Sequence, residues 1–139
     1  MNLPVKIFTM LHILIYRLTG GILGSQMGGQ SMLLLSTTGR KSGKQHVIAI
    51  SYIQDGNHYL LVASNWGKDH HPAWYYNLTS QPLADIQVKA RKLRVTARPA
   101  AAEEYEQLWN YISAKNPMYN RYQQNTRRKI PIIILEPQS

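Results

Sequence analysis

The chain of 139 residues contains no cysteine and few acids. The absence of cysteine excludes disulfides, thiolate metal sites and cysteine nucleophiles, and it fits a reducing cytosol. Only 7 acidic residues face 16 lysines and arginines, so the net charge is +9, and no acid precedes Asp55. A field of this sign attracts anions such as nucleic acid, acidic lipid or a phosphorylated and carboxylated ligand. We predict no nucleic-acid partner, because neither a basic helix nor an aromatic RNA-binding strand is found.

Long uninterrupted hydrophobic runs are also absent. The most apolar stretch, residues 3–18, contains Lys6, His12 and Arg17 and is shorter than the ~20 residues that span a bilayer. The TGGILGS that follows is a poor candidate for a signal-peptide cleavage site. Pro4 near the start and glycines after the end predict an amphipathic helix within residues 1–20, packed on the rest of the domain. The alternative is peripheral contact with the inner face of a membrane by an otherwise cytoplasmic protein.

The remaining sequence predicts a single domain, residues 1–139, of mainly β structure with flanking helices. Six strands are predicted, at residues 32–38, 46–53, 58–64, 84–88, 93–99 and 130–135. Short helices are predicted at residues 69–78, 100–113 and 118–125. An alternating β/α array would need a helix between successive strands, so this order favours a small α+β barrel.

A basic turn, GRKSG at residues 39–43, follows the first predicted strand. Arg40, Lys41 and Lys44 crowd this turn, and Ser42 adds a hydroxyl. The glycines allow the backbone to bend and to direct N–H groups at one point. The turn therefore suits a phosphate or carboxylate, although a solvated hairpin turn is the alternative. It is not a Walker loop, because three residues rather than four separate its glycines.

Four motifs in order, TTGRKSG, ASNWG, HPAWYYNL and RKIPIIILEP, resemble the deazaflavin-dependent nitroreductase family, which includes quinone reductases. The resemblance covers nearly the whole chain, from about Tyr16 to Pro137. It implies a six-stranded split β-barrel of the FMN-binding type. It also implies an oxidoreductase that passes hydride from reduced coenzyme F420 to a quinone, a nitro compound or an activated alkene. The alternatives are an FMN-dependent reductase, or a protein that binds a hydrophobic ligand without turnover. Related flavin barrels are often dimers, which by analogy suggests a homodimer.

The resemblance further implies a cofactor site built from two segments. Because the coenzyme carries a phosphodiester and an oligoglutamate tail, its anionic arm would meet Arg40, Lys41, Ser42, Gly43 and His46. The ring would rest on Ala63, Ser64, Asn65, Trp66 and Gly67, with Trp74 and Asn77 beside it. His46 and Asn65 stand where the family commonly has an arginine and a lysine, so the contacts to the tail are weakened.

Three residues are implied in catalysis. Tyr119 and Tyr122 would lie over the substrate side of the ring, and they or Ser64 would assist protonation. Ordinary core or surface packing is the alternative for both tyrosines, and Tyr16 is a further candidate for the same pocket. The adjacent His70 and His71 have no third ligand at suitable spacing, so we predict no metal site.

Overall fold

The structure, a computed structural model, describes residues 2–27 and 29–138 of the chain. The helices are α1 (Leu3–Leu18), the short 3-10 helix η1 (Asn65–Gly67), α2 (Ala73–Ser80), α3 (Ala102–Lys115) and α4 (Met118–Gln124). The strands are β1 (Gln26–Met27), β2 (Gln30–Thr38), β3 (Gln45–Ser51), β4 (Ile53–Asp55), β5 (His58–Val62), β6 (Leu83–Val88), β7 (Arg91–Pro99) and β8 (Ile132–Pro137).

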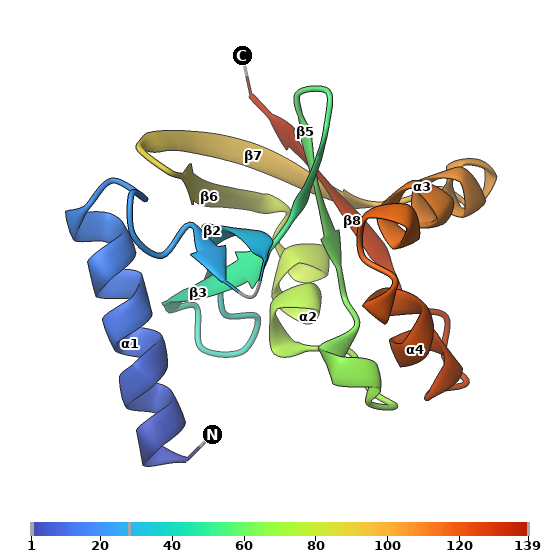
Figure 1. Cartoon of the computed structure of the whole chain (residues 1–139), viewed down its shortest axis with the longest axis horizontal. Coiled ribbons are helices and arrows are strands. Elements are labelled where there is room, and N and C mark those ends of the chain that lie inside the picture. The colour runs from blue at the N-terminus through green and yellow to red at the C-terminus, as the bar shows by residue number, and fades with distance from the viewer. Residues whose placement is uncertain (1, 28, 139) are drawn as a thin grey trace.

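The strands form one strongly curved antiparallel sheet (Figure 1). Its order is β1-β2-β6-β7-β8-β5-β4, and β3, which lies off this path, also pairs with β2. The longest hairpin joins β2 to β3 and places Thr38 opposite Gln45, so the basic turn lies at its tip. This sheet with flanking helices confirms the predicted α+β class.

Two hydrophobic clusters stabilise the fold. The first fills the barrel with alternate residues of β2, β6, β7 and β8, among them Leu33, Leu35 and Ile86. The second lies between the outer face of β5 and β8 and the helices α3 and α4, and it includes Ile112 and Ile130. Because successive side chains of a strand point to opposite faces, β5 and β8 supply residues to both clusters. The second cluster therefore fixes α4 against the sheet.

The six predicted strands correspond to β2, β3, β5, β6, β7 and β8, and β1 and β4 are short additions. The predicted strand at residues 46–53 was too long, because it is interrupted at Tyr52 between β3 and β4. There the amide of Tyr52 donates to the carbonyl of Ser31, and the chain leaves β2 to begin the next hairpin. The predicted helices agree with α2, α3 and α4 to within a few residues.

The N-terminal helix is confirmed, but it packs on the barrel mainly through its carboxyl end. Asn2 caps its first turn by accepting from the amide of Val5, and its other end is held by Tyr16, which is fully buried. The Tyr16 hydroxyl accepts from the amide of Lys89 at 2.6 Å and lies 3.1 Å from the Gln87 carbonyl, to which it donates. Tyr16 therefore anchors α1, and its hydroxyl is taken up by backbone groups of Met32, Gln87 and Lys89.

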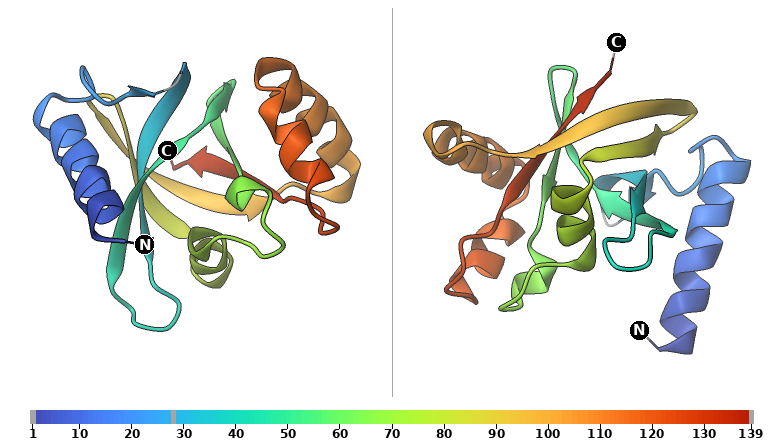
Figure 2. Two further views of the ribbon diagram at one scale, coloured as in Figure 1. Left: turned by 60° about the horizontal axis from the view of Figure 1, so that its bottom comes forward. Right: turned by 180° about the vertical axis from the view of Figure 1, so that it is seen from behind.

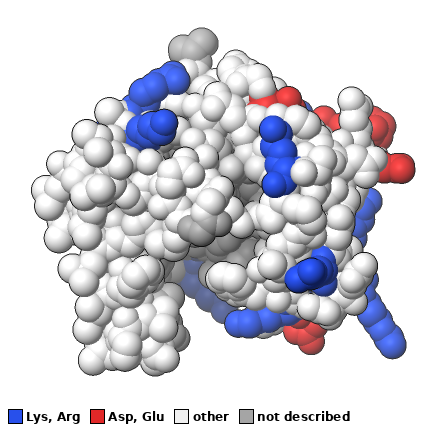
Figure 3. Space-filling model, viewed as in Figure 1, with Lys and Arg blue, Asp and Glu red and all other residues white. Residues whose placement is uncertain are grey.

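Much of the apolar surface of α1 is exposed to solvent. The helix forms an uncharged surface over much of its length at the left of Figure 3. Its exposed apolar residues are Leu3, Val5, Ile7, Phe8, Met10, Leu11, Leu14, Ile15 and Leu18. No helix in the described residues is long and apolar enough to cross a membrane.

Candidate active site

The basic turn is a well-defined loop between β2 and β3. The amide of Gly39 donates to the carbonyl of Lys44 at 2.7 Å, and the amide of Gly43 donates back to the carbonyl of Gly39 at 2.9 Å. Gly43 has φ of 71°, a left-handed conformation that favours glycine. The amide of Lys44 donates to the Ser42 hydroxyl at 3.1 Å. The turn is thus ordered by its own hydrogen bonds.

The cations of this turn are exposed and have no acid beside them. Among the described residues, no salt bridge involves Arg40, Lys41 or Lys44. The Arg40 guanidinium lies over the ring of Tyr76, 4.3 Å from its centroid, and this contact positions it over α2. The turn therefore presents a positive charge that a bound anion would neutralise.

Asn77 of α2 joins the basic turn to the rest of the site. Its Oδ1 accepts from the amide of Arg40 at 3.1 Å, and its Nδ2 donates to the Thr37 hydroxyl at 3.2 Å. Asn77 and Thr37 are both buried. Since α2 follows directly on residues 63–71, these bonds hold the turn and that segment at the same end of the barrel (Figure 2).

The segment after β5 has an unusual backbone. Asn65 and Trp66 have φ of 47° and 61°. Asparagine tolerates this left-handed conformation, whereas for Trp66 it costs about 1–2 kcal/mol. The Trp66 side chain is 75% exposed. Gly67 follows with φ of 78°, and a Cβ placed there would lie 3.1 Å from the Tyr122 carbonyl. Strained backbone that the surrounding structure holds in place is a feature of functional sites.

Arg128 holds this segment and was not among the predicted site residues. Its guanidinium donates to the carbonyls of Ala63, Ser64 and Lys68. Its Nη1 also lies 2.9 Å from Nδ1 of His71. The only signal in the sequence was that Arg128 opens the RKIPIIILEP motif, because its partners are backbone carbonyls and carry no side-chain pattern.

His71 is the side-chain partner of Arg128. Its ring lies 4.5 Å from that of Tyr75, centroid to centroid. Burial, followed by the nearby positive charges of Arg128 and His70, lowers the pKa of His71. The lowered pKa favours a neutral ring, whose Nδ1 accepts the hydrogen bond from Arg128.

An aromatic series leads from the strained segment to the sheet. The Trp66 ring meets Tyr122 edge-on at 6.2 Å between centroids, and Tyr122 meets Tyr119 in the same way at 6.1 Å. The hydroxyls of Tyr119 and Ser51 lie 3.1 Å apart. Burial raises the pKa of Tyr119, so its hydroxyl keeps its proton at neutral pH. A cavity of about 450 Å³ lies beside Tyr119 and Ser51, and neither the basic turn nor residues 63–67 line it.

Two other predicted cofactor residues have mainly structural contacts. Trp74 is half-buried and packs against the barrel core. His46 is exposed, and its Nε2 would lie 2.8 Å from a Cβ placed on Gly39, so the His46 ring packs closely against the backbone of the turn. The structure thus brings the basic turn, Asn77 and residues 63–67 to one end of the barrel, with Tyr122 against Trp66. Tyr119 lies beside Ser51, at the end of β3 that is far from the basic turn.

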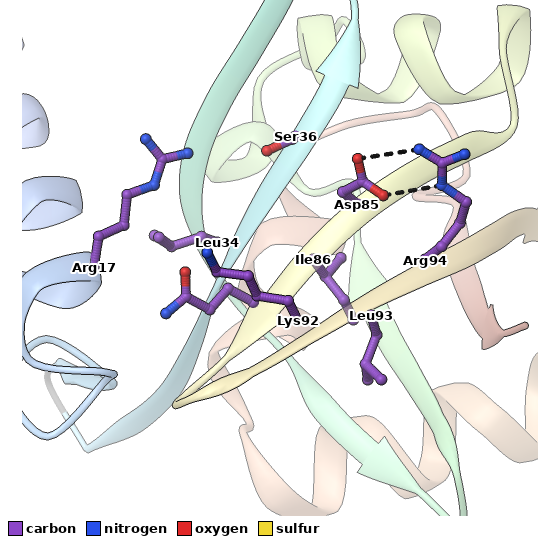
Figure 4. A pocket seen from close by; sticks show the side chains of 9 residues that line it. Arg17, Leu34, Ser36, Asp85, Ile86, Lys92, Leu93 and Arg94 are labelled. Atoms are coloured by element: carbon purple, nitrogen blue, oxygen red, sulfur yellow. Dashed lines mark hydrogen bonds and ion pairs between the residues drawn. The ribbon is translucent and has the colours of Figure 1, made fainter.

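A larger cavity, of about 500 Å³, lies away from this site. It lies between Arg17 of α1 and the outer face of β2, β6 and β7 (Figure 4). Its Arg94 is neutralised by Asp85, with Nε and Oδ1 3.1 Å apart. None of the motif residues discussed above lines this cavity. Its size therefore does not make it the candidate active site.

Comparison with known proteins identifies the family. The family model described as F420H(2)-dependent quinone reductase matches residues 9–137. The chain is 38% identical over 129 residues to the F420H(2)-dependent quinone reductase Rv1261c of Mycobacterium tuberculosis (strain ATCC 25618 / H37Rv), covering 90% of this chain and 87% of that protein. The solved F420-H2 dependent reductase FDR-A is 36% identical, with a TM-score of 0.69 over 76% of this chain and 93% of that one. A solved domain-swapped dimer is 30% identical, with a TM-score of 0.72 over 96% of this chain and all (100%) of that one. The chain belongs to the F420H(2)-dependent quinone reductase family.

Proposed function

We propose that this protein takes a hydride from reduced coenzyme F420 and delivers it to a quinone, and that nitro compounds and activated alkenes are alternative acceptors. One observation carries the proposal beyond family membership. Asn77 ties an unneutralised cationic turn to the helix that follows the strained, aromatic segment at residues 63–67. A coenzyme with an anionic arm and a flat ring needs both features at one end of the molecule.

The residues present fit this cofactor. The phosphodiester would lie against the exposed cations of the basic turn, where Gly43 has open space beside its backbone and leaves room for an anion. The ring would lie against residues 63–67, where the exposed Trp66 offers an aromatic surface. Arg40 and Lys41 would hold the arm, with Ser42, Gly43 and His46 beside them. Asn77 would act through the turn, because its amide group is already bonded to Arg40 and Thr37.

The bound cofactor supplies the hydride, and the protein supplies orientation and a proton. Tyr119 is the best-placed proton donor, because its buried hydroxyl remains protonated and adjoins a cavity that an acceptor can enter. Ser51 accepts from or donates to that hydroxyl and fixes its direction. Tyr122 packs between Tyr119 and Trp66 and excludes water from the space between them. Ser64 is a second candidate donor, because its hydroxyl belongs to the ring-facing segment.

The proposal is tested by mixing purified protein with reduced F420 and following cofactor oxidation by absorbance. We expect micromolar binding and turnover when a short-chain naphthoquinone is added, and slower turnover with a nitroarene or an enone. FMN is titrated in parallel as the matched control. Tight FMN binding without F420 binding would contradict the cofactor assignment. Binding of F420 without turnover of any acceptor would contradict the assigned activity.

We further propose that α1 contributes to a homodimer. The nine exposed apolar residues of this helix need a partner surface, since a patch of this kind on a soluble protein marks an interaction site. The similar domain-swapped dimer aligns with 96% of this chain, a share that extends into the N-terminal helix. A second copy of the chain is therefore the partner that these observations favour over a membrane.

Light scattering after size-exclusion chromatography tests the dimer. The wild-type protein should elute with twice the mass of one chain, and the double variant Phe8→Lys with Leu11→Lys should be monomeric with an unchanged circular dichroism spectrum. A monomeric wild-type protein that sediments with anionic vesicles, and loses this property in the double variant, would instead support membrane contact.

A further inference from the structure

Arg128 binds residues 63–68, which include the segment proposed to face the ring, through its whole guanidinium group. Its Nη2 donates to the carbonyl of Ser64 at 2.8 Å and to that of Ala63 at 3.2 Å. Its Nε donates to the carbonyl of Lys68 at 2.9 Å. Guanidinium is a planar group with five donors in a fixed arrangement, so these bonds fix the carbonyls relative to one another. Residues 63–68 are therefore shaped around a single side chain.

The carbonyl directions determine where the following amides point. A trans peptide is planar, so its N–H points opposite to its C=O, and no peptide bond in the described residues is cis. Since the carbonyls of Ala63 and Ser64 point at Arg128, the N–H groups of Ser64 and Asn65 point away from it. The left-handed conformations of Asn65 and Trp66 then turn the backbone, so that the Lys68 carbonyl also accepts from Arg128.

Arg128 is itself held from α4. Gln123 donates from Nε2 to the carbonyl of Arg128 at 2.7 Å and accepts at Oε1 from the amide of Ile130 at 3.0 Å. The Arg128 side chain has no carboxylate partner within the described residues. A surface arginine is usually solvated or paired with an acid, whereas this one binds backbone carbonyls. The arrangement thus connects the C-terminal motif, through Gln123 and Arg128, to the strained segment.

We propose that Arg128 is a positioning residue for the cofactor: it fixes the peptide planes that direct the N–H groups of Ser64 and Asn65 at the carbonyl oxygens of the deazaflavin ring. This role rests on the proposed function and deepens it. It also explains the strained backbone, because the bonds to Arg128 compensate for the left-handed residues. Arg128 touches neither ring nor acceptor in this proposal, and it acts through the backbone.

The test compares Arg128→Ala and Arg128→Lys with Arg127→Ala, a matched control at an exposed neighbouring arginine. Hydrogen exchange is first measured in the cofactor-free proteins, at the amides of Gly67 and Lys68, which donate to Ser64 and Asn65. We expect exchange to accelerate by about tenfold or more in both Arg128 variants, because charge-assisted hydrogen bonds are lost. The control should exchange like the wild-type protein.

Cofactor affinity is then measured by fluorescence titration. The dissociation constant for F420 should rise by about tenfold or more in both Arg128 variants, and millimolar guanidinium should recover part of the loss in Arg128→Ala. The KM for the quinone should stay unchanged, which a general loss of structure would not allow. If Arg128→Ala does not fold, the exchange rates and the F420 affinity of Arg128→Lys test the proposal.

Unchanged exchange, or faster exchange with unchanged F420 affinity, would overturn the proposal. A wild-type protein that does not bind F420 would refute the proposed function, and the exchange data would still decide whether Arg128 fixes the segment.

Discussion

Replacing Asn77 tests whether the basic turn is held by α2. In Asn77→Ala, the buried Thr37 hydroxyl loses its partner, and leaving such a group unsatisfied costs about 1–3 kcal/mol. The amide of Arg40 also loses its acceptor, but it lies at an exposed residue and water can replace the bond, so this loss is about 0.5–1 kcal/mol. The free energy of unfolding should therefore fall by about 1.5–4 kcal/mol. The melting temperature should fall by about 5–15 °C for a chain of this size.

A double-mutant cycle separates the contact from the cavity left by the smaller side chain. Thr37→Val removes the other partner, and the double variant should be more stable than the sum of the single losses predicts, by about 0.5–1.5 kcal/mol. Urea denaturation measures the stabilities, and titration measures F420 affinity, which should weaken in Asn77→Ala because the cations of the turn are no longer fixed. Additive stabilities together with unchanged F420 affinity would refute the claim that Asn77 connects the two segments.

Three further substitutions test other parts of the site. Gly67→Ala should lower the free energy of unfolding by about 2 kcal/mol in urea denaturation, because the left-handed backbone and the Tyr122 carbonyl both oppose a Cβ. The control Gly56→Ala has open space around its Cβ, so its free energy of unfolding should fall by only about 1 kcal/mol. Equal losses in the two variants would contradict the close approach of Gly67 to Tyr122. Tyr119→Phe should lower kcat by about 100-fold in steady-state assays with F420 affinity unchanged, if its hydroxyl supplies the proton; a wild-type kcat would remove Tyr119 from the mechanism. Because burial lowers the pKa of His71 in the folded protein, the unfolded chain takes up its proton first as pH falls below 6.5, and stability should decline from there toward the folded-state pKa. A His71→Gln variant should lose that part of the pH dependence in urea midpoints, and an unchanged pH profile would show that His71 does not contribute.

The sequence was sufficient to predict the six main strands, and their order, with few helices between them, favoured a small α+β barrel. The split-barrel type was implied by the family resemblance. The limits of β3 and β4 were missed, since the break at Tyr52 depends on a backbone bond to Ser31 in another strand. The predicted packing of α1 was only partly right. Its periodicity marks an apolar surface, but it cannot show that Tyr16 alone would be fully buried while much of that surface stays exposed.

The candidate site was predictable where a motif carries its own chemistry, as in the basic turn. Asn77 was predicted to lie beside the ring, and in the structure its amide group bonds the backbone of Arg40 and the hydroxyl of Thr37. Arg128 could not be assigned a role, because its acceptors are main-chain carbonyls 60 to 65 residues away in sequence. Side-chain patterns contain no information about such bonds.

The central claim is that the basic turn binds the anionic arm of the cofactor and residues 63–67 bind its ring. Affinities for intact F420 and for the deazaflavin without its phosphodiester and glutamates, measured in Lys41→Gln and Trp66→Ala, test this most directly. Lys41→Gln should weaken the binding of intact F420 by about 10-fold or more, because it removes a positive charge that holds the anionic arm. Binding of the stripped deazaflavin should be unaffected, because that ligand lacks the anionic arm. Trp66→Ala should weaken both by a similar factor. Equal effects of Lys41→Gln on the two ligands, or no effect of Trp66→Ala on either, would contradict the account.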